Sequence, residues 1–342
     1  MSLLKPNSYV GVDIGTSGIK VVQLKKNLVL EHYGEIELPY QLCRSESPKD
    51  LPKLVEALKR VKKEVNITSE FAQTALPGAL VFTRILELPL VGNHEKIDQA
   101  VRWQARQYVP VPIEEVYLDW YAIDVPPRVK SLMQILIVAA PKTIVNHYLS
   151  VFQSAGFNLR GLEIESFALQ RSLIGDDERG FVIVDVGAST TEINISYKSS
   201  MLLNRNLDIG CQAMIRNIAE NLGIKEERAY KFLKKFGLEP DKLVGQIPKA
   251  LSRVLNDILA EIREIRRLFK VKFKMDIEKI VLSGGGARIP YLSSFLQDQL
   301  GKEVILGDPW SRINYPKRLE GELKKIGPNF AVAVGLAMRE LV

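Results

Sequence analysis

Residues 12–20, Val-Asp-Ile-Gly-Thr-Ser-Gly-Ile-Lys, decide the fold of this 342-residue chain. They lie between two apolar runs, residues 9–12 and 19–24, and predict a strand, a tight turn and a second strand. A turn of glycine and hydroxyl residues can present several donors on one side and cradle a phosphate.

Each residue type in this turn suits phosphate and metal binding. Gly15 permits the tight backbone, and Thr16 and Ser17 add hydroxyl donors. Asp13, at the end of the first strand, could hold a hydrated divalent cation, and Lys20 supplies a positive charge. Gly/Ser hairpins are common, so an ordinary turn explains this stretch equally well until a second copy is found.

The second copy is residues 181–193, Phe-Val-Ile-Val-Asp-Val-Gly-Ala-Ser-Thr-Thr-Glu-Ile. Its aspartate lies 185 − 13 = 172 residues after the first. The pattern of apolar strand, Asp, glycine, small hydroxyl residues and second strand repeats. The predicted phosphate and metal residues here are Asp185, Gly187, Ala188, Ser189 and Thr190.

A third glycine turn follows at residues 280–290, Ile-Val-Leu-Ser-Gly-Gly-Gly-Ala-Arg-Ile-Pro. Gly284, Gly285 and Gly286 would let a flat ligand approach the backbone, and Arg288 could stack on a base. Two similar lobes facing a cleft would therefore form one site for a nucleoside triphosphate, with hydrated Mg²⁺ between Asp13 and Asp185. The glycine spacings differ from the P-loop and Rossmann fingerprints.

Composition excludes several other classes. Hydrophobic residues make up 46% and charged residues 25% of the chain, and no apolar run reaches the roughly 18 residues of a membrane span. The N-terminus has no signal-peptide core, so we expect a cytoplasmic protein. Cys43 and Cys211, and three histidines, form no metal pattern. The net charge of +7 resides mainly in amphipathic helix faces, and no nucleic-acid motif is present.

Hydrophobic periodicity predicts the order of elements. Three strands, a helix at residues 51–63 and further strands come before residue 90. A helix from residue 93 or 94 to about 108, two strands, a helix and a strand at 158–164 then form an α+β group that looks inserted. We predict a first lobe at 1–89, an inserted subdomain at 90–164, a connecting helix at 165–180, and a second lobe at 181–342 with a helical part at about 211–275 and a final helix at 328–342 that returns to the first lobe.

This arrangement resembles the actin-like ATPase superfamily. Residues 12–20 and 181–192 look like its two phosphate motifs, 281–288 like its adenosine motif, and 164–169 and 327–335 like its two connecting helices. The resemblance implies an α/β actin-like ATPase fold, with two related lobes of mixed sheets around a nucleotide cleft. The segment at 90–164 resembles the extra α+β subdomain of the FtsA type.

Within the superfamily, the chain is most similar to the PilM family of type IV pilus assembly. The strings that carry this resemblance are residues 11–24, 102–112 and 282–290. FtsA-like proteins continue into a linker and an amphipathic membrane helix, whereas this sequence ends at Val342, directly after the second connecting helix. That ending favours the PilM family.

The resemblance implies a cytoplasmic adaptor that binds ATP and Mg²⁺. It would dock the cytoplasmic N-terminal peptide of PilN, contact other inner-membrane and motor proteins of the pilus, and be peripheral to the inner membrane through that partner. We also consider self-association possible, and we expect neither nucleic-acid binding nor direct insertion into the membrane. Trp103, Tyr108 and residues 109–112 could line the peptide groove, or could equally be subdomain core or surface.

Two departures from the family pattern concern the nucleoside end. Many relatives have two glycines where this chain has Gly210 and Cys211, and an Ala-Glu-x-x-Lys stretch where this chain has Ala229 and Tyr230. Gly210 is nevertheless predicted to contact the nucleotide. These changes leave the phosphate residues intact and put base selectivity in question.

The sequence alone leaves the catalytic mechanism undecided. By resemblance, Glu165 would orient the attacking water, although an acid in the first turn of a helix also stabilises that helix; Asp185 could orient the water through magnesium. At most we expect a slow Mg-dependent ATPase. The alternatives are an FtsA-like filament-forming ATPase and, with less support, a small-molecule kinase of the same fold.

Overall fold

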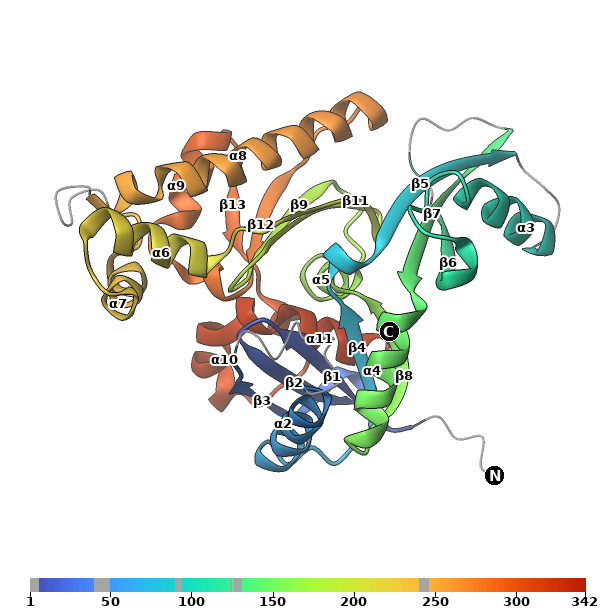
Figure 1. Ribbon diagram of the computed structural model, residues 1–342, viewed down its shortest axis with the longest axis horizontal. Helices are drawn as coiled ribbons and strands as arrows, with labels where there is room; N and C mark the ends of the chain where they lie inside the picture. The colour runs from blue at the N-terminus through green and yellow to red at the C-terminus, as the bar shows by residue number, and fades with distance from the viewer. Residues whose placement is uncertain (1–5, 40–49, 90–93, 124, 126–130, 240–245) are drawn as a thin grey trace.

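The computed structural model describes residues 6–39, 50–89, 94–123, 125, 131–239 and 246–342. Cys43 and the predicted helix start at Asn93 lie outside these residues. The described chain forms two five-stranded sheets and one three-stranded sheet, with helices around them (Figure 1).

The N-terminal part of the chain builds the first five-stranded sheet. Three antiparallel strands come first, and two parallel strands extend the sheet on the side of β1, giving the order β3-β2-β1-β4-β8. These strands are β1 (Ser8–Gly15), β2 (Gly18–Lys25), β3 (Val29–Glu37), β4 (Phe71–Leu76) and β8 (Asn158–Ile164).

The second five-stranded sheet repeats this topology. An antiparallel meander is again extended by two parallel strands, in the order β11-β10-β9-β12-β13. The strands are β9 (Phe181–Val186), β10 (Thr191–Tyr197), β11 (Ser200–Leu207), β12 (Lys279–Ser283) and β13 (Val304–Leu306). The two Asp-containing hairpins therefore occupy equivalent positions in the two sheets, and the predicted pair of related lobes is confirmed.

The third sheet corrects the predicted boundaries of the inserted segment. It contains β5 (Phe82–Pro89), β6 (Val116–Ile123) and β7 (Leu132–Pro141) in the antiparallel order β5-β7-β6, covered by α3 (His94–Ala105). We predicted β5 in the first lobe and β8 in the insertion at 90–164, but β5 pairs with β7 and β8 pairs with β4. Periodicity identifies a strand but not its partner.

Helices cover the outer faces of the two large sheets. In the first lobe α2 (Leu51–Glu64) and α4 (Lys142–Ser154) pack on the sheet through Leu58 and Phe152, both fully buried. In the second lobe α8 (Gln246–Phe273) places its apolar stripe against the sheet, beside α6 (Cys211–Leu222), α7 (Glu226–Phe236) and α9 (Leu292–Leu300). The short elements α10 (Glu320–Ile326) and β13 were not predicted.

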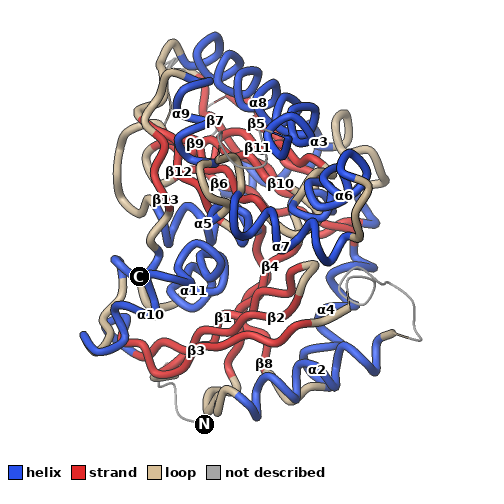
Figure 2. The backbone as a smooth tube through the Cα atoms, turned by 90° about the vertical axis from the view of Figure 1, so that its left-hand side faces the viewer, coloured by secondary structure: helices blue, strands red, loops and turns tan. Residues whose placement is uncertain are grey.

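Two helices lie between the large sheets. They are α5 (Glu165–Leu173) and α11 (Ala331–Met338), and Figure 2 shows α11 between the two groups of strands. The helix α11 is buried on all sides. A Cβ on Gly11 would lie 2.0 Å from the carbonyl oxygen of Ala333, and one on Gly335 would lie 2.0 Å from that of Ala168. Only glycine at both positions allows α11 to pack this closely against β1 and α5.

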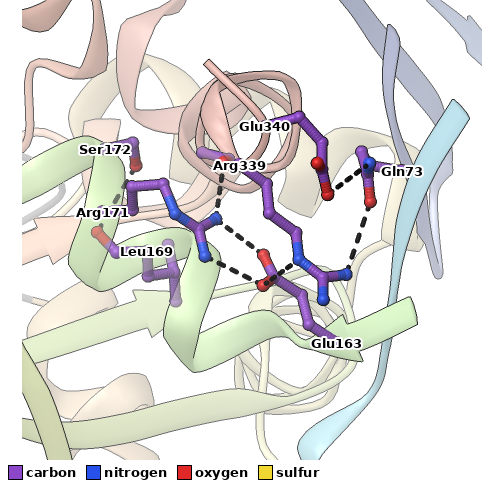
Figure 3. A network of polar contacts seen from close by, with 8 residues as sticks. Gln73, Glu163, Leu169, Arg171, Ser172, Arg339 and Glu340 are labelled. Carbon is purple, nitrogen blue, oxygen red and sulfur yellow. Dashed lines mark hydrogen bonds and ion pairs between the residues drawn. The ribbon is translucent and has the colours of Figure 1, made fainter. Parts of the chain in front are cut away.

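A polar network fastens this central layer (Figure 3). The carboxylate of Glu163, at the end of β8, accepts hydrogen bonds from both terminal nitrogens of Arg171 at 2.7 and 2.9 Å. Nε of Arg339 lies 3.6 Å from the same carboxylate, and Arg171 also donates to the carbonyl oxygen of Gly335 at 2.7 Å. The side chain of Glu163 is 5% exposed, so this one carboxylate ties β8, α5 and the end of α11 together.

We predict that Glu163→Gln lowers the free energy of unfolding by about 3 kcal/mol, because it leaves two arginines without their buried anion. Denaturant unfolding followed by circular dichroism measures this change. Glu320→Gln, which removes an exposed pair with Lys324 within one helix, is the control and should have no measurable effect. Equal stabilities for wild type and Glu163→Gln would show that the network does not hold the layer.

Candidate functional site

A cavity of about 550 Å³ lies between the two large sheets. This volume is within the usual range for small-molecule sites. Its walls include the β1–β2 turn and β3 from the first lobe, and the β9–β10 turn, α6 and α7 from the second. The cavity thus lies where the two duplicated hairpins face each other.

The tips of the two hairpins touch. Gly15 pairs with Gly18 in the first turn, and the backbone N–H of Gly187 donates to the carbonyl oxygen of Thr190 in the second at 2.8 Å. Between them the hydroxyl of Ser189 donates to that of Thr16 at 3.0 Å. Two hydroxyls at this contact could turn to donate to an anion placed between the hairpins.

The floor of the cavity holds one lysine among several carboxyl groups. Nζ of Lys20 lies 3.4 Å from Oδ2 of Asp13, and both side chains are buried. Burial opposes the charge on Lys20, but the carboxylates of Asp13, Glu35 and Asp185 outweigh burial and raise its pKa. Lys20 is therefore a permanent cation in this cleft.

The carboxyl groups outnumber that lysine, and the pKa values of Asp185 and Glu165 are raised. Burial, and then the charge of Asp13, raise the pKa of Asp185 to about 6. Glu165 opens α5 and its pKa is raised well above the ordinary value by burial first, and then by Glu192, Asp13 and Asp185. This part of the cavity is short of positive charge.

Glu192 is a site residue that the sequence analysis did not assign. On β10 it lies opposite Asp185 in the register and lines the cavity. Asn204 donates to its Oε1, while its buried Oε2 has no hydrogen-bond partner. Burial and Asp185 raise its pKa to about 7, although polar interactions with Asn194, Asn204 and Glu165 oppose the rise. The sequence did offer one signal for this residue, because polar side chains recur at every second position of the strand, at Glu192, Asn194 and Ser196.

These residues fit a hydrated magnesium ion. Mg²⁺ is usually held by one or two carboxylates, water and phosphate oxygens rather than by a cage of protein ligands. Within the part of the chain that the structure describes, no group of three or more His, Cys, Asp or Glu side chains is placed to chelate a metal. Asp13 and Asp185, with the raised carboxyl pKa values and the unpaired oxygen of Glu192, match a site in which one or two carboxylates hold a hydrated ion.

The glycine turn shapes another part of the cavity wall. Gly284 has φ +79°, and a Cβ there would lie 2.4 Å from the carbonyl oxygen of Val186. Its N–H donates to the carbonyl oxygen of Pro328 at 2.9 Å. Asn329 donates to Glu35 of the first lobe at 3.0 Å. These contacts give a close-packed wall in which backbone, rather than side chains, faces the cavity.

The structure brings most of the predicted site residues together. The residues that line the cavity are Asp13, Gly15, Thr16, Ser17, Lys20, Glu165, Asp185, Gly187, Ala188, Thr190, Gly284 and Gly285. Four others do not line it. Ser189 bonds to Thr16, Gly210 lies behind Ala188, and Gly286 is buried against Val186. Arg288 is exposed at the end of the turn, so its predicted stacking on a base has no support in this arrangement.

Further lining residues come from elements that sequence reasoning did not connect to the site. They are Glu35 and Glu37 on β3, the turn at Pro77–Ala79, Gln212 on α6, Tyr230 on α7 and Asn329. Gly78 reaches the second lobe, where a Cβ on it would lie 3.0 Å from Oε1 of Glu192. Tyr230 was noted only as a departure from a motif.

The family model described as "Type IV pilus assembly protein PilM" matches residues 11–341. The chain belongs to the PilM family. One solved structure similar to it is a PilM-PilN type IV pilus biogenesis complex, with a TM-score of 0.85 and 27% identity over 98% of both chains. Membership confirms the resemblance found in the sequence, and with it the assignment to type IV pilus assembly.

More distant similarities agree on the fold. The cell division protein FtsA of Enterococcus hirae is 24% identical, over 90% of this chain and 79% of its own length. EutJ of Carboxydothermus hydrogenoformans has a TM-score of 0.60 and 17% identity, covering 98% of this chain and 91% of its own. MreB5 of Spiroplasma citri bound to AMPPNP has a TM-score of 0.55 and 13% identity, covering 97% and 95%. The fold is actin-like. Among the described residues, no helix is long and apolar enough to cross a membrane.

The raised carboxyl pKa values predict how stability depends on pH in EDTA. Glu192 has a pKa of about 7 when folded and an ordinary value of 4.5, so the folded protein binds its proton more tightly. The stability that this gives is present below the lower value and is lost as the pH rises through about 7. We expect a lower Tm at pH 8 than at pH 5.5.

Two variants make the test specific. Glu192→Gln should reduce this fall in Tm, whereas Glu303→Gln, at an exposed ion pair with Lys279, should leave it unchanged. Scanning calorimetry across the pH series provides the measurement. The same fall in wild type and Glu192→Gln would refute a raised pKa at this position.

Proposed function

We propose that the cleft binds ATP with Mg²⁺ and that the chain is an adaptor of type IV pilus assembly that docks the cytoplasmic N-terminal peptide of a PilN-type protein. Nucleotide binding is supported by one observation above all. Two duplicated hairpins meet at Thr16 and Ser189, beside Lys20, the buried Asp13 and the half-buried Asp185. AMPPNP bound to the related fold of MreB5 is consistent with this use of the cleft.

Each part of the cleft has a role in binding the triphosphate. The hydroxyls of Thr16 and Ser189 would exchange their mutual hydrogen bond for bonds to phosphate oxygens, and Lys20 would contribute its charge. Asp13 and Asp185 would hold the water shell of Mg²⁺, which when bound neutralises charge on the phosphates. Glu165 and Glu192, deepest in the cleft and beside each other, would orient a water molecule. Hydrolysis, if it follows, would be slow.

The peptide surface is proposed from the distribution of exposed apolar side chains. Five of the thirteen large hydrophobic side chains exposed in the described chain lie within residues 103–121. Trp103 is 65% exposed, and the ring of Tyr108 lies 3.8 Å below the guanidinium of Arg84. Exposed aromatic side chains are typical anchors of a binding partner. Through such a partner the chain would be peripheral to the inner membrane.

We predict that Asp13→Ala weakens ATP binding in Mg²⁺ by about tenfold or more, because Asp13 orients the metal's water ligands. In EDTA the same variant should bind ATP as well as wild type or better, since a repelling carboxylate is gone. Isothermal titration calorimetry measures both. Glu37→Ala, an exposed cleft carboxylate, is the control and should keep the Mg²⁺ dependence of wild type. Unchanged affinity of Asp13→Ala in Mg²⁺ would contradict the placement of the metal.

Peptide docking is tested with a fluorescent peptide of the PilN-type N-terminus. We expect Trp103→Ala to lower its affinity about tenfold in an anisotropy titration. Tyr291→Ala is the control, since Tyr291 is 51% exposed in the second lobe, directly before α9. No binding to wild type, with or without Mg-ATP, would remove the docking proposal. An equal loss of peptide affinity in both variants would show that the peptide docks elsewhere on the chain.

A further inference from the structure

The described residues that line the cavity include a single aromatic side chain, Tyr230. It belongs to α7, which lies with α6 at the side of the second lobe away from the three-stranded sheet (Figure 1). The side chain is 49% exposed. A large half-exposed ring at the wall of a polar cavity is available to a ligand.

The orientation of Tyr230 follows from the packing of its helix. The helix α7 buries Ala229 and Leu233, which are 0% and 3% exposed, against the helical core of the second lobe. Tyr230 follows Ala229 by about 100° around the helix, so its ring is turned out of that core. Its nearest cation is Lys234, one turn later, whose Nζ is 5.9 Å from the ring centre. The fold therefore does not use this ring for its own packing.

Several residues that line the cavity together with Tyr230 suit a flat, uncharged group. Gly284 and Gly285 present backbone without side chains. The thiol of Cys211 is neutral because burial raises its pKa to about 11. The side-chain amide of Gln212 offers both a donor and an acceptor, the pair of groups that reads the edge of a base.

We propose that Tyr230 is the wall on which the nucleobase of the bound triphosphate stacks, and that this contact selects purines over pyrimidines. The inference rests on the proposed nucleotide site and adds its base specificity. Stacking on an aromatic side chain depends on overlap, so the two-ring purine gains more than a pyrimidine.

The test separates base binding from phosphate binding. Isothermal titration calorimetry in Mg²⁺ compares ATP, CTP and inorganic tripolyphosphate on the full chain. The variants are Tyr230→Phe, which keeps a ring, Tyr230→Ala, which removes it, and Leu306→Ala, which shortens an equally exposed apolar side chain, 49%, on β13. We expect Tyr230→Ala to bind ATP about tenfold more weakly and tripolyphosphate as wild type does. Tyr230→Phe and Leu306→Ala should bind ATP within about twofold of wild type.

The outcomes distinguish this inference from the proposed function. Wild type should prefer ATP to CTP, and Tyr230→Ala should lose most of that preference. ATP binding unchanged in Tyr230→Ala, or ATP and tripolyphosphate weakened together, would overturn the stacking role while leaving the nucleotide site in place. Failure of wild type to bind either ATP or tripolyphosphate would overturn the nucleotide site and the stacking role with it.

Discussion

The structure depends on how closely α11 approaches its neighbours on both sides. Gly11 in β1 and Gly335 in α11 remove the two side chains that would separate this helix from the first sheet and from α5. Because the helix is buried on all sides, it sets the spacing of the two lobes as well as filling it. The contact between Thr16 and Ser189 is possible only at this spacing. If the two lobes were farther apart, the β1–β2 and β9–β10 turns would not meet and would not form one site.

The charges that line the cleft determine which kind of ligand it suits. Lys20 is the cation among Asp13, Glu165, Asp185 and Glu192, and the raised pKa values of three of these acids record the imbalance. The proposed ligand carries a divalent cation that would supply the missing positive charge, and its phosphates would meet the lysine and the hairpin hydroxyls. The proposed base site differs, because it is formed by the backbone of Gly284 and Gly285, uncharged side chains and the exposed ring of Tyr230.

Much of this could be predicted from the sequence, because it depends on local pattern. The duplicated Asp-containing hairpins, the helix at residues 51–64 and the glycine turn at 284–286 each have a signature within about fifteen residues. The membership of strands in sheets could not be predicted. The sequences of β5 and β8 predict ordinary strands. Only their pairing partners show that β5 belongs to the three-stranded sheet and β8 to the first lobe. Glu192 and Tyr230 were missed because their role depends on what lies opposite, and Arg288 was assigned by adjacency to the glycines.

The central claim is that one Mg-nucleotide lies between the two hairpins, and a crystal structure with Mn²⁺ and AMPPNP tests it most directly. The account predicts an anomalous manganese peak between Asp13 and Asp185, phosphate oxygens bonded to Thr16 and Ser189 in place of their mutual hydrogen bond, and the purine against Tyr230. A nucleotide bound elsewhere, or a manganese peak away from both aspartates with the Thr16–Ser189 bond intact, would contradict it.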